Sequence, residues 1–189
     1  MDLLSVIKGG DLKKAKALYD VPSGVTLAIV TTEVIKTLIN LQDYYTDDDV
    51  MWFFNRRAST NPLEYKDIIV DLAKQHREQL FKYVISTLAN YDCALETYQD
   101  ILIELALNDL IDHITLLSEV MRFETTTILT GNATSWAELL CKSIYKKARE
   151  SLKMSTESTS KYLQAEFVIR NLFDVPARKR FKWEAKYIV

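Results

Sequence analysis

The sequence predicts an all-α protein of stacked helical hairpins, an α-solenoid closed by a C-terminal capping helix and tail. Three observations lead to this fold class. The 189 residues contain only four Gly and three Pro, which are gathered at a few places in the chain. The stretches between them are rich in Leu, Ala, Lys and Glu and carry apolar residues at helical spacing. A pattern of two short helices also recurs at an interval of about 33 residues.

The composition is that of a folded chain. Hydrophobic residues make up 48% and charged residues 26% of the chain, which excludes a disordered protein. No uncharged stretch approaches the roughly 18 apolar residues that a membrane-spanning helix needs. The chain starts Met-Asp-Leu-Leu without the basic residues of a secretory signal, and we therefore expect a cytoplasmic protein. The two cysteines, Cys93 and Cys141, are too few for a disulfide framework and are expected as buried thiols.

Residues that break helices divide the chain into segments. The clear breaks fall at residues 20–24 with Pro22 and Gly24, at 55–62 with Pro62, and at 124–132 with Gly131. A weak break is expected at residues 89–92 and a polar one at 155–160, and Pro176 opens the last segment. The segments between these breaks are long enough for one or two short helices each.

Helices are expected in pairs, in chain order. The first four pairs are residues 3–8 with 11–19, 34–40 with 50–54, 67–76 with 77–87, and 100–108 with 109–120. Within residues 77–87, for example, Leu80, Phe81 and Val84 recur at the spacing of one helix face. A fifth helical segment runs over residues 136–152.

The pairs resemble one another in sequence. Leu72-Ala73 superposes on Leu105-Ala106 at an offset of 33 residues, and Val6-Ile7 lies 66 residues before Leu72-Ala73. The second pair follows the same pattern once a few inserted residues are allowed within residues 43–49. The repetition indicates that each pair is one structural unit.

A 33-residue unit of a short helix, a tight turn and a second helix resembles the ankyrin repeat. The first unit carries the resemblance best, because Gly9-Gly10-Asp11 lies where that family turns between its helices. The resemblance implies a helical-repeat domain over residues 1–160, with a C-terminal helix and a basic–aromatic tail at 161–189 that pack on it. None of the units has the Thr-Pro-Leu-His opening of the family, and another helical-hairpin stack or an irregular bundle is the alternative.

The sequence offers little catalytic chemistry. The glycines are too few and too widely spaced for a phosphate-binding loop, and no Gly-x-Ser-x-Gly elbow is present. We therefore expect no enzyme, no cofactor and no small-molecule ligand. Asp109, Asp112, His113 and Glu119 lie at helical spacing and could bind a divalent metal, but a solvated helix edge is the favoured interpretation, and no metal is expected.

The charge of the chain is uneven. Residues 142–189 hold 12 Lys and Arg against 5 Asp and Glu, a net charge of +7, whereas residues 1–141 hold 12 against 21, a net charge of −9. Basic residues that alternate with aromatics suit nucleic acid, because phosphates pair with cations and bases stack on rings. The candidate residues for this are Lys146, Lys147, Arg149, Arg178, Lys179, Arg180, Lys182 and Trp183. The favoured alternative is that the apolar residues of this tail fold back and cover the last repeat.

A second candidate surface is aromatic and acidic. The candidate residues for binding a protein partner are Tyr44, Tyr45, Asp47, Asp48, Asp49 and Trp52. Aromatic residues are over-represented at protein-binding hot spots, and three consecutive aromatics beginning at Trp52 cannot all face one core. The three aspartates are expected at the start of a helix near Val50, where the helix dipole favours negative charge.

The function that we expect is that of a non-enzymatic protein–protein interaction module, an adaptor or an inhibitor. If the chain is ankyrin-like, the resemblance implies binding through the loop tips and the concave face of the inner helices. Three alternatives stay open: a nucleic-acid-associated protein using the basic C-terminal segment, an acidic decoy that blocks a basic partner, and a structural subunit of a larger assembly.

Overall fold

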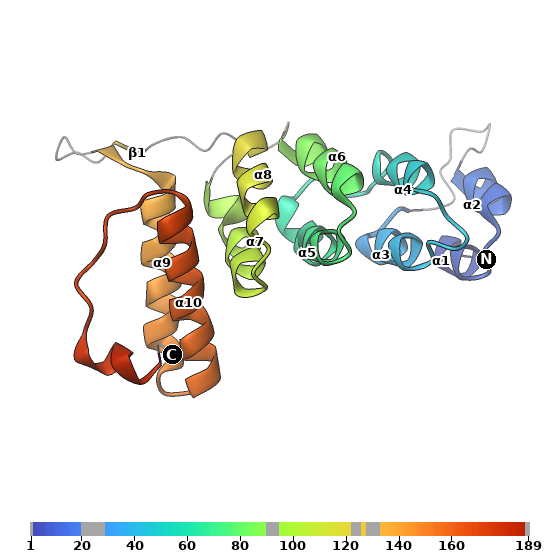
Figure 1. The fold of residues 1–189 in the computed structure, drawn as a ribbon. Helices are drawn as coiled ribbons and strands as arrows, with labels where there is room; N and C mark the ends of the chain where they lie inside the picture. The colour runs from blue at the N-terminus through green and yellow to red at the C-terminus, as the bar shows by residue number, and fades with distance from the viewer. Residues whose placement is uncertain (1, 20–28, 90–94, 122–125, 128–132, 188–189) are drawn as a thin grey trace. The chain divides into compact units, whose positions relative to one another are not determined.

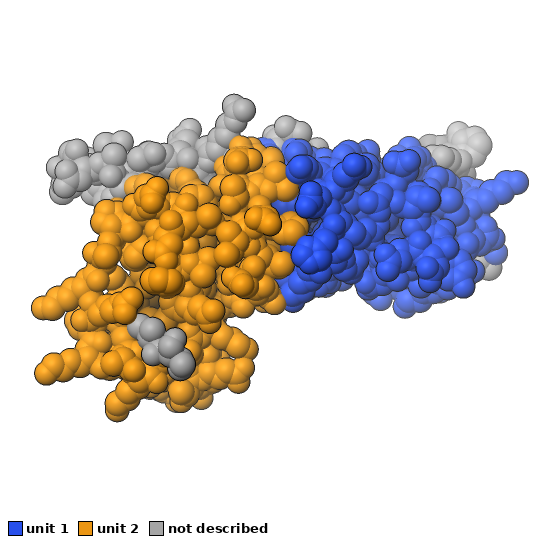
Figure 2. Space-filling view, viewed as in Figure 1, with its two compact units in different colours: residues 1–91 blue, residues 92–189 orange. Residues whose placement is uncertain are grey.

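The computed structural model describes residues 2–19, 29–89, 95–121, 126–127 and 133–187 of the chain. The chain divides into two compact units, residues 1–91 and 92–189, which are coloured separately in Figure 2. Within the described residues the structure is helical apart from one pair of two-residue strands. The predicted all-α class is therefore confirmed.

Unit 1 consists of short helices joined in hairpins. Its elements are α1 (Leu3–Lys8), α2 (Leu12–Tyr19), α3 (Thr32–Asn40), α4 (Asp47–Phe54), the 3₁₀ helix η1 (Pro62–Tyr65), α5 (Lys66–Lys74) and α6 (Glu78–Ala89). The helix α3 packs against α1 and α5, and α6 packs against α4 and α5. Figure 1 shows α1, α3 and α5 side by side in one layer and α2, α4 and α6 in the other.

Unit 2 begins with another hairpin and ends with two long helices. Its elements are α7 (Leu95–Leu107), α8 (Ile111–Met121), β1 (Thr126–Thr127), β2 (Ala133–Thr134), α9 (Trp136–Ser151), α10 (Thr156–Leu172) and the 3₁₀ helix η2 (Lys182–Lys186). The strands pair antiparallel, with Thr126 opposite Thr134. The helix α10 packs along α9 and also contacts α7, and the chain after α10 turns back toward the other end of this helix pair (Figure 1).

The predicted break at residues 55–62 is confirmed as the connection between α4 and α5. The Ala58 N–H donates to the carbonyl of Val30 at 3.0 Å, next to an isolated parallel bridge between Val30 and Arg57. Pro62 begins η1, where its missing N–H costs no helical hydrogen bond. The other breaks with Gly or Pro before residue 140, at 20–24 and around Gly131, lie outside the described residues.

The start of α4 is determined by a capping box. The sequence pattern predicts a start near Val50, whereas α4 begins at Asp47 because Thr46 is its N-cap. The Thr46 hydroxyl accepts from the Asp49 N–H at 3.3 Å, and the Asp49 carboxylate accepts from the Thr46 N–H at 3.1 Å. The three aspartates therefore occupy the first turn, where the helix dipole favours negative charge, as expected.

The start of α10 differs from the predicted polar break at residues 155–160. Ser155 is an N-cap whose hydroxyl accepts from the Ser158 N–H at 3.2 Å, so the helix already begins at Thr156. Thr159 is fully buried, and its hydroxyl lies 2.9 Å from that of Ser151 in α9. A domain boundary after residue 160 would therefore cut through α10, whereas the two compact units divide between residues 91 and 92.

Three hairpin turns contain a residue with a left-handed backbone. These residues are Gly10, His76 and Asp109, with φ of 75°, 53° and 58°. The last two turns also share a Schellman hydrogen bond, from Arg77 N–H to the Leu72 carbonyl and from Leu110 N–H to the Leu105 carbonyl, both at 3.0 Å. Gly10 precedes His76 by 66 residues and His76 precedes Asp109 by 33. The interval found in the sequence is thus an interval between left-handed residues of hairpin turns.

Residues at equivalent positions of the hairpins are buried. The first helices bury Val6-Ile7, Leu72-Ala73 and Leu105-Ala106, each residue at most 5% exposed. One turn into the second helices lie the fully buried residues Ala15, Val50, Phe81 and Ile114. Each hairpin therefore buries the apolar faces that the 33-residue pattern places on it, and within unit 1 neighbouring hairpins pack on one another.

We predict that Gly10→Ala lowers the free energy of unfolding by about 1–2 kcal/mol, because an L side chain is strained at positive φ. A Cβ there would also lie 2.9 Å from Cδ1 of Tyr44. Urea denaturation followed by circular dichroism measures the change. The control is Gly9→Ala, at a φ of −79°, for which we expect a loss of less than about 0.5 kcal/mol. Equal losses in the two variants would contradict the prediction.

Candidate functional site

The two tyrosines of the predicted partner-binding segment have different environments. Tyr44, in the turn between α3 and α4, is 65% exposed. Tyr45 is only 2% exposed, and its hydroxyl donates to the carbonyl of Ile7 at 2.8 Å. Burial raises the pKa of the Tyr45 phenol, with smaller contributions from the Asp11 and Asp49 carboxylates. The expectation that Tyr45 contacts a partner is corrected here, because its side chain anchors this turn to α1.

Two of the three predicted aspartates form ion pairs within unit 1. Asp47 pairs with Arg77, and Asp49, which is 8% exposed, accepts from Lys16 Nζ at 2.9 Å. Burial alone would raise the pKa of Asp49, but the bonds from Lys16 and Thr46 outweigh it, and the pKa lies below its ordinary value. Asp49 therefore connects α2 to α4 rather than facing a partner, and Asp48 is the exposed member of the three.

Trp52 is the outward-facing member of the three consecutive aromatics. Its two neighbours Phe53 and Phe54 are fully buried, whereas Trp52 is half-buried. The Arg56 guanidinium carbon lies 3.6 Å from the centroid of a Trp52 ring. Lys16 Nζ also lies over a ring of Trp52, 5.4 Å from its centroid. The prediction that one of the three aromatics leaves the core is confirmed.

The residues weighed as a metal site do not form one cluster. Asp109 holds the left-handed position of the α7–α8 turn, His113 is 5% exposed, and Asp112 and Glu119 are exposed on α8. Throughout the described part of the chain, no three His, Cys, Asp or Glu side chains gather closely enough to hold a metal ion.

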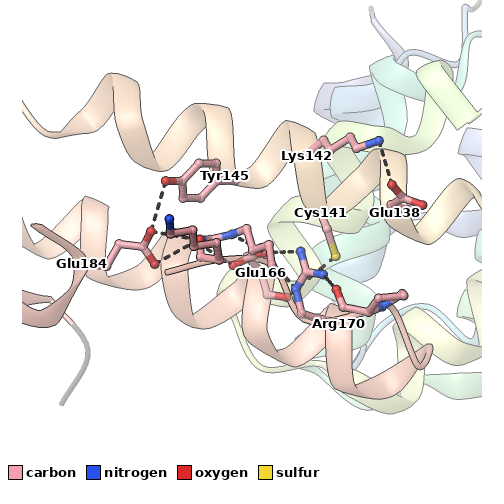
Figure 3. Close-up of polar contacts among 10 residues, drawn as sticks. Glu138, Cys141, Lys142, Tyr145, Glu166, Arg170 and Glu184 are labelled. Carbon is pink, nitrogen blue, oxygen red and sulfur yellow. Dashed lines mark hydrogen bonds and ion pairs between the residues drawn. The ribbon is translucent and has the colours of Figure 1, made fainter. Parts of the chain in front are cut away.

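The charged centre of unit 2 is a set of four residues that we call the C-terminal ion cluster: Glu166, Arg170, Arg178 and Glu184. Arg178 donates from Nη2 to Glu166 at 3.0 Å and from Nη1 to Glu184 at 2.8 Å. Arg170 donates to Glu166 from one turn further along α10, with Nη2 at 2.5 Å (Figure 3). The two carboxylates are only 5% and 1% exposed. Two arginines thus compensate two buried carboxylates in one connected network.

The cluster changes the ionisation of its members. Burial alone would raise the pKa of Glu184, but the hydrogen bonds from Arg178, the Phe181 N–H and Tyr145 together lower it. Burial likewise would lower the pKa of Arg178, and the bonds to the two carboxylates outweigh it and raise that pKa. Both groups are therefore held in their charged forms, as the ion pair requires.

Aromatic contacts reinforce the attachment of the C-terminal segment. Trp183 stacks on Tyr145 of α9 at a centroid distance of 6.1 Å, and the Arg178 guanidinium lies 3.7 Å over the Tyr145 ring. The Tyr145 hydroxyl donates to Glu184 at 3.1 Å (Figure 3), and the Ser160 hydroxyl donates to the carbonyl of Tyr187 at 2.8 Å. Arg178 and Trp183, both candidates for nucleic-acid contact, are therefore used to attach this segment to α9 and α10.

Cys141 lies next to the cluster, and its thiol has low reactivity. It is fully buried, and its Sγ lies 3.9 Å from the carbonyl oxygen of Glu166. Burial raises the pKa of the thiol to about 12, so the nucleophilic thiolate is scarce at neutral pH. The prediction of a buried thiol is confirmed for Cys141, whereas Cys93 lies outside the described residues.

The other predicted basic residues remain at the surface. Lys146 lies 3.9 Å from Glu150, and Lys147 lies 3.2 Å from Asp100. Arg149, Lys179, Arg180 and Lys182 are exposed, and no carboxylate of the described residues lies within ion-pair distance of them. These four cations are therefore available to an anionic partner.

A groove of about 500 Å³ lies between α10 and the C-terminal segment. Phe167, which is 51% exposed, lines it together with Gln164 and Arg180, and the C-terminal ion cluster forms part of its lining. The charges of the cluster are paired with one another. The groove therefore combines an apolar side chain, Phe167, with one exposed cation, Arg180, that is not part of the cluster.

Sequence reasoning did not find most of these contacts. Glu166 and Arg170 are four residues apart on one helix, so the sequence spacing alone could have predicted their ion pair. Tyr145 and Glu184 are separated by 39 residues, and no local pattern brings them together.

Comparisons of the chain with known protein families, with curated proteins and with solved structures gave no match. None of the helices in the described ranges has the length and apolar character needed to cross a bilayer. The contacts described above are therefore the basis for a functional proposal.

We predict that Arg178→Ala lowers the free energy of unfolding by about 2–4 kcal/mol, because it leaves two buried carboxylates short of a cation. Thermal and urea denaturation followed by Trp fluorescence measure the loss. The control is Lys179→Ala, an exposed neighbour, which should change the stability by less than about 0.5 kcal/mol. Similar effects of the two substitutions would show that the C-terminal ion cluster is not a stabilising element.

The lowered pKa of Glu184 predicts a loss of stability in acid. The unfolded chain, in which this glutamate has its ordinary pKa of about 4.3, binds the proton more readily than the folded chain. The stabilisation is thus complete above that pH and is lost as the pH falls through the folded pKa. Glu184→Gln should show a shallower decline of the unfolding free energy between about pH 5 and pH 3. If Glu150→Gln, at an exposed carboxylate, flattened the decline equally, the assignment to Glu184 would be wrong.

Proposed function

We propose that the protein is a non-enzymatic protein–protein interaction module, an adaptor or inhibitor, whose hairpins form an ankyrin-like stack. The 33-residue interval between left-handed turns and the two layers of helices in unit 1 support the stacking (Figure 1). Neighbouring helices of the α1–α3–α5 layer also carry ion pairs, from Lys8 to Glu33 and from Lys36 to Asp67. Proteins of this architecture act by offering extended surfaces to a partner.

The observation that supports binding best is an aromatic surface on α4 and the turn before it, which we call the α4 surface: Tyr44, Asp48, Trp52 and Arg56. Asp48 and Trp52 are four residues apart and therefore lie on one side of α4. Arg56 follows four residues later, just after the helix ends, on the same side. Tyr44 presents a large side chain that is 65% exposed, and its ring is in contact distance of the Gly10 backbone. Tyr, Trp and Arg are the residues most enriched at binding hot spots.

The α4 surface is also held in place before any partner arrives. Arg56 and Lys16 fix the Trp52 side chain from its ring face, and Lys16 is itself bonded to Asp49. An ordered aromatic side chain loses less conformational entropy when it binds, which leaves more of the contact energy for affinity. The loop tips that the ankyrin resemblance also implies, at residues 20–28, 90–94 and 128–132, lie outside the described residues.

The proposal is tested by affinity capture with the full-length chain from nuclease-treated lysate of its native cells. We expect at least one protein that is retained by the unaltered chain and reduced about tenfold or more by Tyr44→Ala and by Asp48→Lys, because hot-spot truncations cost about 2 kcal/mol or more. The matched control is Leu63→Ala, which removes another exposed apolar side chain of unit 1, 45% exposed, away from the α4 surface. Circular dichroism confirms that each variant is folded.

Two outcomes would overturn this assignment. One is the absence of any protein that survives nuclease treatment. The other is a partner whose retention is insensitive to Tyr44→Ala and Asp48→Lys, which would place the interaction on a different surface.

A further inference from the structure

In unit 2 the acidic and the basic residues lie in different parts of the sequence and on different helices. Residues 95–121, which form α7 and α8, contain six Asp and Glu and no Lys or Arg. Residues 142–189, which form most of α9, all of α10 and the C-terminal segment, carry a net charge of +7. The two kinds of charge meet at the ion pair from Lys147 to Asp100. A positive field therefore persists on the α9 side of the unit.

Six cations of this region have no carboxylate of the described residues within ion-pair distance. They are Arg149, Lys153, Lys179, Arg180, Lys182 and Lys186, and all six are exposed. The other cations of the region are compensated, including Arg170 and Arg178 in the C-terminal ion cluster. The compensated arginines hold the segment in place, and the six remaining cations face solvent.

Contacts between η2 and α9 bring these cations together. Trp183 of η2 stacks on Tyr145, in the middle of α9, so η2 lies against this helix. Lys142, Lys146 and Arg149 of α9 and Lys153, two residues after its end, line a shallow hollow of about 800 Å³. Tyr145 also lines this hollow, and Trp183 stacks on it, so η2 lies next to the cations of α9. We call the exposed cations of residues 149–153 and of the C-terminal segment 179–186 the basic face of unit 2.

Phe181 distinguishes this face from a general anion-binding surface. Its side chain is 53% exposed, although an apolar C-terminal segment would be expected to bury it, and in the sequence it lies between the exposed cations Arg180 and Lys182. The Phe181 N–H donates to Glu184 at 3.0 Å, which ties the backbone at this position to the C-terminal ion cluster. An exposed ring among cations suits a nucleotide, because the ring stacks on the base while the cations pair with the phosphates.

We propose that the basic face of unit 2 binds single-stranded nucleic acid, with Phe181 as the stacking residue and the six exposed cations as phosphate contacts. A single strand fits better than a duplex, because its bases are free to stack on a side chain. A peptide of Asp and Glu alone would match the charge but would give Phe181 no stacking partner. The proposal goes beyond the interaction module of unit 1 and depends on different residues.

Fluorescence anisotropy with the full-length chain and a labelled 20-nucleotide oligo-dT tests the proposal. We expect saturable binding whose logarithm of affinity falls with the logarithm of salt concentration at a slope of roughly −4, since six phosphate contacts each contribute about −0.7. Binding of a 20-base-pair duplex and of a labelled polyglutamate peptide of similar charge should be weaker. Absence of oligo-dT binding at about 50 mM salt would overturn the proposal.

Variants separate stacking from charge. Phe181→Ala should weaken oligo-dT binding roughly 5- to 150-fold and leave the salt slope unchanged, because it removes a stacking contact and no cation. The triple variant Lys179→Ala, Arg180→Ala and Lys182→Ala should reduce the magnitude of the slope by about 2. The matched control on α10 is Lys161→Ala, at a cation paired with Glu157, and it should not change binding.

The opposite pattern would assign the face to an acidic protein. Equal affinity for oligo-dT and polyglutamate, together with no effect of Phe181→Ala, would overturn the nucleic-acid proposal. Tyr44→Ala, which tests the α4 surface, should leave oligo-dT binding unchanged, so the two proposals fail independently.

Discussion

Helices as short as those of unit 1 are not stable in water by themselves. Two of them, α1 and α3, have six and nine residues, whereas isolated helices need roughly 12–15 residues even with favourable sequences. Their stability has to come from burying one face against a neighbour, and the hairpins satisfy this need in turn because equivalent positions of each are apolar. The tight turns follow from the same constraint, because a left-handed residue brings the second helix back onto the first.

Unit 2 meets a different constraint at its C-terminal end. Here the helices α9 and α10 have 16 and 17 residues, and the segment after them is held by charge as well as by apolar contact. Burying Glu166 and Glu184 would be unfavourable without Arg170 and Arg178, and the network satisfies both carboxylates. The same network keeps the backbone of Phe181 in place and leaves the neighbouring cations in solvent. An internal ion cluster and an outward basic face are thus consequences of one arrangement.

The two proposed surfaces have one structural feature in common. Beside each surface aromatic residue lies a group that is fixed by an ion pair: Lys16, paired with Asp49, lies over Trp52, and Glu184, paired with Arg178, accepts from the backbone N–H of Phe181. The Trp52 side chain, ordered by Arg56 and Lys16, therefore loses less entropy on binding. The surfaces differ in charge, since the α4 surface carries both positive and negative side chains, whereas the basic face of unit 2 is positive. They are therefore suited to different partners.

The sequence by itself determined the helical class, most helix positions and the 33-residue interval, because helix propensity, apolar spacing and chain breakers are local properties. It also placed the aspartates of α4 at a helix start and one of three aromatics outside the core. It did not determine that Tyr45 is buried under α1, that Asp49 is bonded to Lys16, or that α10 begins before residue 160. Nor could it divide the basic tail into Arg178, which is internal, and its neighbours, which are exposed. Those outcomes depend on pairs such as Tyr145 and Glu184, 39 residues apart, which only the tertiary structure brings into contact.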